Sequence, residues 1–293
     1  MCISGPMTIT GTTRLLGVIG DPVGHSLSPV MHNAALAELG ADYVYVAFPV
    51  TSADLAAALV GLTAIAVQGF NVTIPHKQRI IPLLAELTAD AQAIGAVNTV
   101  WPTARGWAGT NTDIKGFTAP LRLAQDWSGG TALVLGNGGA ARAVVAGCVQ
   151  LGLERIAIAG RNPEKLEAFQ SRWQTSPIQP HLTVCPWTNL ADILPEVDLI
   201  VNTTPLGMAA SSDQSPLAPS DLDRVSSHAL VYDLIYTPRP TRLLTLAAER
   251  GLATLDGLEM LVQQGAAALE IWLQQSVPVA TMRQALLKQL GEH

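Results

Sequence analysis

The sequence is poor in cysteine, and this shortage excludes two classes of site. Cys2, Cys148 and Cys185 are the three cysteines among 293 residues, and they lie far apart. An odd and scattered set argues against a disulfide framework or a cysteine-based metal site, so we expect three ordinary thiols. The six histidines have no ligand partners at metal-binding spacing, and we therefore expect no bound metal.

Charged residues and long apolar runs are scarce as well. Charged residues make up 14% of the chain, the formal net charge is -6, and lysine and arginine form no run. These features argue against a nucleic acid or an anionic membrane as partner and favour a small molecule. No apolar stretch reaches the roughly 20 residues of a membrane-spanning helix, and residues 1–14 lack a signal-peptide pattern. We therefore expect a cytoplasmic protein, either a monomer or a homodimer.

Short apolar segments alternate with helical patterns along the chain, a rhythm typical of α/β folds. Together with the length, this favours two α/β domains over one large domain. Strands are predicted at 15–20, 43–50, 66–73, 131–135, 155–159, 199–202 and 230–236.

Helix boundaries are marked by local signals. The first helix should have Ser28 as its cap and Pro29 in its first turn, and should end at Gly40. Further helices are predicted at 52–61, near 115–125, and as one long segment after Gly257. Residues 1–13 are predicted to be a mobile tail, with Met7 as an alternative start, and the region from 98 is predicted to be a loop that bridges two halves.

A glycine-rich segment follows the predicted strand 131–135 and has the spacing G-x-G-x-x-A of a dinucleotide-binding turn. Gly136 would permit the tight turn, Gly138 would let the backbone approach a pyrophosphate, and the following helix would offer free N–H groups to the anion. A plain strand-to-helix turn also uses glycine, but the flanking strand and helix favour a cofactor site. Its predicted contacts are Gly136, Asn137, Gly138, Gly139, Ala140 and Ala141.

The next predicted strand ends without the acidic residue that usually accepts the ribose hydroxyls of NAD. Arg161 and Lys165 instead place positive charge where the 2'-phosphate of NADP would lie. Both could also be ordinary solvated charges. Their position after the strand favours NADP as the cofactor.

Several polar segments occur at predicted strand ends and in loops. They are 20–29 (GDPVGHSLSP), 71–77 (NVTIPHK), 95–99 (GAVNT), 109–113 (GTNTD), 202–208 (NTTPLGM), 232–236 (YDLIY) and 256–264 (DGLEMLVQQ). Together, and in this order, they closely resemble the shikimate dehydrogenase family. The resemblance covers nearly the whole chain.

The resemblance implies a catalytic pair, Lys77 and Asp113. Hydride transfer to a carbonyl requires a proton for the developing alkoxide. Lys77 would supply this proton, and Asp113 would orient Lys77 and bind the reacting hydroxyl. The alternative is a solvated surface ion pair.

The resemblance also implies substrate contacts. Ser26, Ser28 and Tyr236 would bind a carboxylate, although Ser28 could be only a helix cap and Tyr236 only a core tyrosine. Ring hydroxyls would contact the polar groups of Thr73, Asn98 and Gln264 as well as the catalytic pair. The remaining cofactor contacts would be Thr203, Met208, Leu234 and Gly257. Met208 could equally be a core residue.

The expected architecture is an N-terminal α/β substrate-binding domain, residues 1–112 with 257–293, plus a Rossmann NADP-binding domain, residues 113–256. The active site would lie in the cleft between them. The implied reaction is the reversible NADPH-dependent reduction of 3-dehydroshikimate to shikimate. Two departures from the family pattern stand out: Gly160-Arg161-Asn162 replaces the common Asn-Arg-Thr, which removes one phosphate contact, and Asn137 replaces a common alanine.

Two other functions stay open. A quinate or dual quinate/shikimate dehydrogenase would be suggested by threonine in the S-x-S motif or an acid in place of Arg161, and neither is present. A non-catalytic NADP-binding sensor would be expected to lose Lys77 or Asp113, and both are retained.

Overall fold

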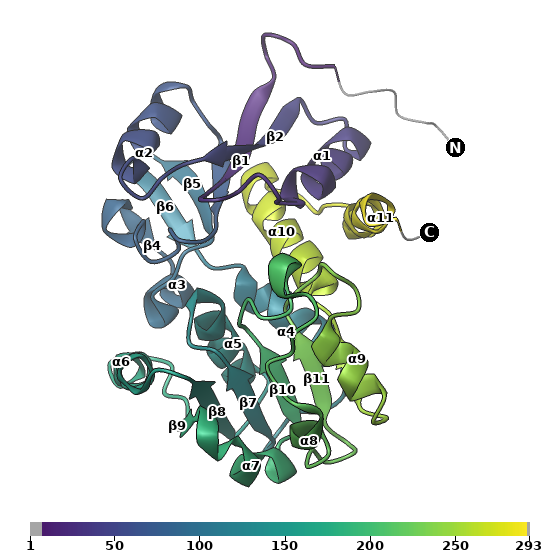
Figure 1. Ribbon diagram of the computed structural model, residues 1–293. Helices are drawn as coiled ribbons and strands as arrows, with labels where there is room; N and C mark the ends of the chain where they lie inside the picture. The colour runs from purple at the N-terminus through teal and green to yellow at the C-terminus, as the bar shows by residue number, and fades with distance from the viewer. Residues whose placement is uncertain (1–7, 292–293) are drawn as a thin grey trace. The chain divides into compact units, whose positions relative to one another are not determined.

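Figure 1 shows a computed structural model of the chain, which describes residues 8–291. The chain divides into two compact units, unit 1 with residues 1–112 and 262–293, and unit 2 with residues 113–261. Cys2, Met7, His293 and the first seven residues of the predicted tail lie outside the described residues. No helix within residues 8–291 is long and apolar enough to cross a membrane.

Unit 1 contains a mixed six-stranded sheet in the order β2-β1-β3-β5-β6-β4. β1 pairs in parallel with β2 and β3, whereas β5 runs antiparallel to β3 and β6. The strands are β1 Arg14–Gly20, β2 Tyr43–Pro49, β3 Gly69–Val72, β4 Glu86–Leu87, β5 Thr99–Thr103 and β6 Gly106–Thr110. Its helices are α1 Ser28–Glu38, α2 Leu55–Ala64, α3 Ala89–Ile94, the unit 1 part of α10 Leu258–Leu273, and α11 Val279–Gln289.

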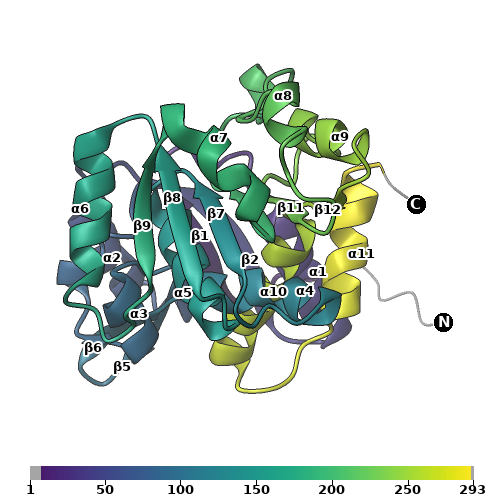
Figure 2. The same ribbon diagram turned by 90° about the horizontal axis from the view of Figure 1, so that it is seen from below.

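Unit 2 contains a six-stranded sheet in which every pair is parallel, in the order β12-β11-β10-β7-β8-β9. Figure 2 shows β9, β8 and β7 side by side, with α6 next to β9. The strands are β7 Thr131–Leu135, β8 Arg155–Gly160, β9 Leu182–Pro186, β10 Leu199–Asn202, β11 Leu230–Asp233 and β12 Ala253–Leu255. Its helices are α4 Asp113–Ala124, α5 Gly139–Gln150, α6 Pro163–Trp173, α7 Leu190–Ile193, α8 Pro219–Leu222 and α9 Arg242–Ala248.

Each unit has its own apolar core. In unit 1, Ile19, Phe70 and Val100 from the sheet pack with Leu59 of α2. In unit 2, Leu133 and Ile200 belong to a separate buried cluster. All five side chains of β7 are buried, and those of Ala132, Leu133, Val134 and Leu135 are apolar, as expected for a parallel strand covered on both faces.

Three predictions about secondary structure were wrong. The region after residue 98 is not a loop but a hairpin of β5 and β6, whose Trp107 is buried against Phe70. The closing helix is interrupted and forms α10 and α11. Ser28 is the first residue of α1 rather than its cap, because Leu27 already has helical backbone angles.

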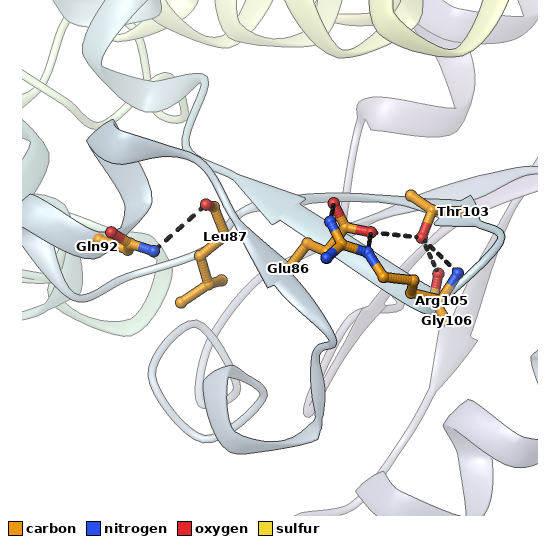
Figure 3. A network of polar contacts seen from close by, with 6 residues as sticks. All are labelled: Glu86, Leu87, Gln92, Thr103, Arg105 and Gly106. Atoms are coloured by element: carbon orange, nitrogen blue, oxygen red, sulfur yellow. Dashed lines mark hydrogen bonds and ion pairs between the residues drawn. The ribbon is translucent and has the colours of Figure 1, made fainter.

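Two pairs of side-chain hydrogen bonds hold short segments of unit 1 in place. The hairpin is joined to β4 by Glu86, which accepts hydrogen bonds from the Thr103 hydroxyl at 2.9 Å and Arg105 Nε at 2.8 Å (Figure 3). At the other end of unit 1, the hydroxyls of Thr12 and Thr13 each donate to the Asp42 carboxylate at 2.7 Å. Residues 12–13 are therefore attached to unit 1 and are not part of a mobile tail.

Candidate active site

Asn98 lies at the centre of a buried polar cluster in unit 1. Its Oδ1 accepts from the backbone N–H of Thr112 at 2.7 Å and from the Thr99 hydroxyl at 2.9 Å. Its Nδ2 donates to Thr112 Oγ1 at 3.0 Å and to Gln264 Oε1 at 3.3 Å. The structure thus brings together two predicted ring-hydroxyl contacts, Asn98 and Gln264, although they are 166 positions apart.

Tyr45 and Asn71 extend this cluster. The Asn71 Nδ2 donates to the Asn98 carbonyl at 3.0 Å, so its Oδ1 faces Tyr45 and accepts the phenolic proton at 2.7 Å. We call Tyr45, Asn71, Asn98, Thr99, Thr112 and Gln264 the amide cluster. Four of its members, Tyr45, Asn71, Thr99 and Thr112, were not among the predicted site residues, because their long-range partners leave no local signal.

Ser28 lies next to the amide cluster and is 8% exposed. Its carbonyl accepts from His32 Nδ1 at 2.9 Å, and the His32 ring stacks on Tyr45 with centroids 4.1 Å apart. Burial raises the pKa of Tyr45 well above 10.0, and a hydrogen bond from Ser28 opposes that rise. Ser26 and Thr73 are partly exposed, and Ser26 Oγ accepts from the Ser28 N–H at 3.3 Å.

The segment that carries Lys77 is held from both sides. The Lys77 carbonyl accepts from the Val97 N–H at 2.8 Å, and the His76 N–H donates to the Thr73 carbonyl at 2.9 Å. The His76 ring is fully buried, and its Nε2 donates to the Val50 carbonyl at 2.7 Å. His76 is thus an internal anchor, a role that its isolated position in the sequence did not indicate. Lys77 belongs to unit 1, whereas Asp113, buried at the start of α4, belongs to unit 2.

The glycine turn of unit 2 has the shape that the sequence predicts. Gly136 has a φ of +101°, and a Cβ there would lie 2.7 Å from Thr203 Oγ1, so only glycine fits without strain. Gly138 precedes α5, and a Cβ added to it would meet no atom within 4 Å. Open backbone at the N-terminus of a twelve-residue helix is a suitable place for a pyrophosphate. The residues present therefore fit a dinucleotide.

Arg161 and Lys165 lie at the other predicted cofactor position, at the start of α6. Arg161 is exposed immediately after β8, and Asn162 caps α6 by accepting from the Lys165 N–H at 3.0 Å. Asn162 therefore has a structural role of its own. Both cations remain accessible within one helical turn of the strand end.

A second buried polar cluster follows β10 and β11. Asn202 Nδ2 donates to Asp233 Oδ1 at 3.0 Å, and the Thr241 hydroxyl donates to Asp233 Oδ2 at 2.7 Å. Burial raises the pKa of Asp233 from 3.8 to about 6, although its hydrogen bonds act in the opposite direction. We call Asn202, Asp233 and Thr241 the Asp233 cluster. The family resemblance places the segment 202–208 around the nicotinamide, but none of these three residues was among the predicted site residues.

Four residues predicted to contact ligands lie in the segments that follow β10, β11 and β12. They are Met208, Leu234, Tyr236 and Gly257. Met208 is 37% exposed, so it is not a core residue. Tyr236 is partly buried, and burial raises the pKa of its hydroxyl. Gly257 packs against Leu234, because a Cβ there would lie 2.0 Å from the Leu234 carbonyl oxygen. Within residues 8–291, no three His, Cys, Asp or Glu side chains are placed to hold a metal ion.

Family models match three segments of the chain. The substrate-binding domain of shikimate dehydrogenase matches residues 18–100, shikimate / quinate 5-dehydrogenase matches 120–234, and the C-terminal domain of shikimate 5'-dehydrogenase matches 257–287. The chain belongs to the shikimate dehydrogenase family. The family and the α/β fold class predicted from the sequence are therefore confirmed.

Full-length relatives support this assignment. A shikimate dehydrogenase (NADP(+)) of Synechocystis sp. is 59% identical over 284 residues, which cover 97% of this chain and 98% of the relative. A solved shikimate dehydrogenase in complex with NADP+ superposes with a TM-score of 0.87 at 36% identity, covering 98% of this chain and 99% of that one. A quinate dehydrogenase from Corynebacterium glutamicum in complex with NAD gives a TM-score of 0.86 at 29% identity, covering 94% and 99%.

Proposed function

We propose that this chain catalyses the reversible reduction of 3-dehydroshikimate to shikimate with NADPH. The observation that carries this proposal is the match, over nearly its whole length, to relatives named shikimate dehydrogenase (NADP(+)). The chain retains the polar segments of both units, and the glycine turn of unit 2 fits a dinucleotide.

The bound cofactor would supply a hydride to the carbonyl carbon, and the chain must supply the proton. Lys77 donates that proton to the oxygen as negative charge develops there, and Asp113 orients the reacting group. After each reduction Lys77 regains its proton from solvent, and in the reverse reaction it accepts the proton of the substrate hydroxyl and releases it to solvent. The hydrogen bond from the Val97 N–H to the Lys77 carbonyl fixes the backbone from which this side chain extends.

The substrate is bound at two ends. Ser26, Ser28 and Tyr236 bind the carboxylate with hydroxyl groups, which suits an anion that accepts but does not donate hydrogen bonds. Thr73, Asn98 and Gln264 contact the ring hydroxyls. Because Asn98 already has protein partners for both ends of its amide, it holds Gln264 in place as much as it binds the ligand.

NADP is bound by unit 2. Its pyrophosphate would lie over residues 136–141 at the N-terminus of α5, and Arg161 and Lys165 would bind the 2'-phosphate. Thr203, Met208, Leu234 and Gly257 complete the predicted cofactor site. Gly257 contributes through close packing against Leu234 rather than through a side chain.

We further propose that unit 1 is the substrate-binding domain and unit 2 the NADP-binding domain. The match of the substrate-binding family model to residues 18–100 supports the first assignment. A cytoplasmic location follows from the composition and the biosynthetic reaction. Sedimentation analysis of the purified chain would distinguish a monomer from a homodimer.

Initial rates of NADPH or NADH formation test the proposal. Shikimate and quinate are each assayed once with NADP+ and once with NAD+ as the cofactor. The Lys77→Ala variant is measured beside the wild type. Rapid turnover with shikimate and NADP+, abolished in the variant, is the expected result. Comparable rates with quinate or NAD+ would support the dual enzyme that the quinate dehydrogenase neighbour makes plausible, and cofactor binding without any turnover would support a sensor.

A further inference from the structure

Asp233 is a fully buried carboxyl group at the last residue of β11, and the proposed function gives it no task. It lies at the carboxyl end of a parallel strand, where ligands of such sheets bind. Asn202, the last residue of the neighbouring strand β10, is paired with it in the register of the sheet. The two residues therefore stand where two predicted ligand-binding turns begin.

Three hydrogen-bond donors from different segments converge on this carboxyl group. Oδ1 accepts from Asn202 Nδ2 at 3.0 Å and from the Ile235 backbone N–H at 3.1 Å. Oδ2 accepts from the Thr241 hydroxyl at 2.7 Å. Asp233 thereby connects the end of β10, its own following turn and the cap of α9.

Asn202 transmits this connection into the turn after β10. Its Oδ1 accepts from both the backbone N–H and the hydroxyl of Thr204, at 3.0 and 2.7 Å, and its Nδ2 also donates to the Leu206 carbonyl at 3.3 Å. The amide therefore shapes the turn that carries Thr203 and leads to Met208. On the other side, the bond to Ile235 lies between Leu234 and Tyr236, so the same carboxyl group sets the second turn.

An ionised carboxylate satisfies this arrangement better than an amide would. All three partners donate, and a carboxylate offers only acceptor sites. An asparagine would direct an N–H group at one of them. The Thr241 hydroxyl would then have to accept instead, although it already accepts from the Leu244 N–H at 3.4 Å as the cap of α9.

We propose that Asp233 is a positioning residue that holds the two turns carrying Thr203 and Met208, and Leu234 and Tyr236, in the geometry that binds cofactor and substrate. In this role Asp233 acts through the turns and not through contact with cofactor or substrate. This inference rests on the proposed function, because it takes the roles of those four residues from it. Displacing a binding group by about 1 Å can cost roughly 100-fold in rate, so a weak change in turn geometry is measurable.

The test compares Asp233→Ala, Asp233→Asn and a control, Asp198→Ala, in the full chain. Asp198 precedes β10 at the opposite end of the same sheet, and its carboxyl group likewise accepts from a partly buried backbone N–H, that of Thr131, at 2.7 Å. The readouts are the Kd for NADP+ by fluorescence titration, the KM for shikimate, kcat and the thermal midpoint.

We expect Asp233→Ala to raise the Kd for NADP+ and the KM for shikimate by roughly tenfold or more, with Asp233→Asn in between. Asp198→Ala should lower the thermal midpoint while leaving both binding constants within about twofold, because it lies away from the turns. Equal effects of Asp233→Ala and Asp198→Ala on binding, or unchanged binding in Asp233→Ala, would overturn the proposal.

Thr241→Val serves if Asp233→Ala does not fold. It removes one donor but keeps the carboxyl group, and a Kd for NADP+ that stays at the wild-type value in both Thr241→Val and Asp233→Asn would also overturn the proposal. A failure of the proposed function can be distinguished from a failure of this inference. Wild-type protein that binds NADP+ but does not turn over shikimate refutes the reaction, while the Kd measurements still test Asp233.

Discussion

The buried polar clusters of units 1 and 2 are built from different chemical groups. The amide cluster of unit 1 contains only amides and hydroxyls, and its neighbour His32 has a pKa lowered to about 4 by burial, so it is neutral at pH 7. The Asp233 cluster of unit 2 centres on a carboxyl group whose pKa burial raises to about 6. Burying a neutral group requires only a partner, whereas burying a carboxylate also carries a large desolvation cost. The stability of unit 1 should therefore depend mainly on the hydrogen-bond partners of its buried neutral groups. The stability of unit 2 should depend on the ionisation state of Asp233.

The largest expected effect is the loss of kcat on removal of Lys77, the proposed proton donor of unit 1. Lys77→Ala should lower kcat by about 1000-fold, because general acid catalysis typically contributes roughly 100- to 10,000-fold. Substrate binding and thermal stability should change much less. Steady-state kinetics with shikimate and NADP+ measure this, with Lys288→Ala on the exposed side of α11 as the control. Retention of most of the rate in Lys77→Ala would assign proton transfer to another group.

The second effect is an opposite response of the two units to acid. Unfolding exposes His32, which then takes up a proton below pH 6.5 instead of below about 4, so the stability of unit 1 falls as pH drops through that window. Folded Asp233 is protonated below about pH 6 but the unfolded chain only below 3.8, so unit 2 gains stability as pH drops from about 6 to 3.8. Each difference corresponds to about 3 kcal/mol.

Hydrogen exchange followed amide by amide from pH 4 to 7 separates these two slopes. His32→Gln should flatten the slope of unit 1 only, and Asp233→Asn that of unit 2 only. The comparison between the units breaks down if the two variants flatten the same set of amides, or if neither changes its slope.

The third effect tests the dependence of the amide cluster on its partners. Tyr45→Phe removes the proton that Asn71 Oδ1 accepts and should reduce the free energy of unfolding by about 2 kcal/mol, the usual cost of an unsatisfied buried polar group. Tyr43→Phe is the matched control, since its exposed hydroxyl only accepts from Arg14 at 3.2 Å. Urea denaturation measures both. Equal stability of the two variants would mean that water or another group replaces the lost bond.

The smallest effect concerns exposed charge in unit 2. Arg161→Ala should weaken NADP+ binding by about tenfold, as expected for one charge-assisted contact in water, and leave NAD+ binding unchanged. Arg155→Ala, at the other end of β8, is the control because it binds Glu196 and Thr131 and lies far along the strand. Titration of both cofactors gives the answer. A parallel loss for NAD+ would show that Arg161 does not recognise the 2'-phosphate.

The sequence predicted four of the six strands of unit 2, missing β9 and β12, and three of the six strands of unit 1, missing β4, β5 and β6. Strands buried on both faces are continuous apolar runs, and β7 and β10 lie where they were predicted. The hairpin of β5 and β6 has no such run, because Pro102 and Gly106 interrupt it and its stability depends on pairing with β3 and β4. The predicted cap at Ser28 was wrong for a different reason, because the backbone of Leu27 already turns into α1.

By itself, the sequence determined the family, the α/β class, the glycine turn and the residue types available for the reaction. These features depend on neighbours along the chain, such as the positive φ of Gly136 or the alternation of strand and helix. Only the tertiary structure decided that Asn98 contacts Gln264, that His76 is buried and that Asp233 gathers three donors. Burial and most of these contacts depend on segments far apart in sequence, and the same residue types in an open loop would be bonded to water instead.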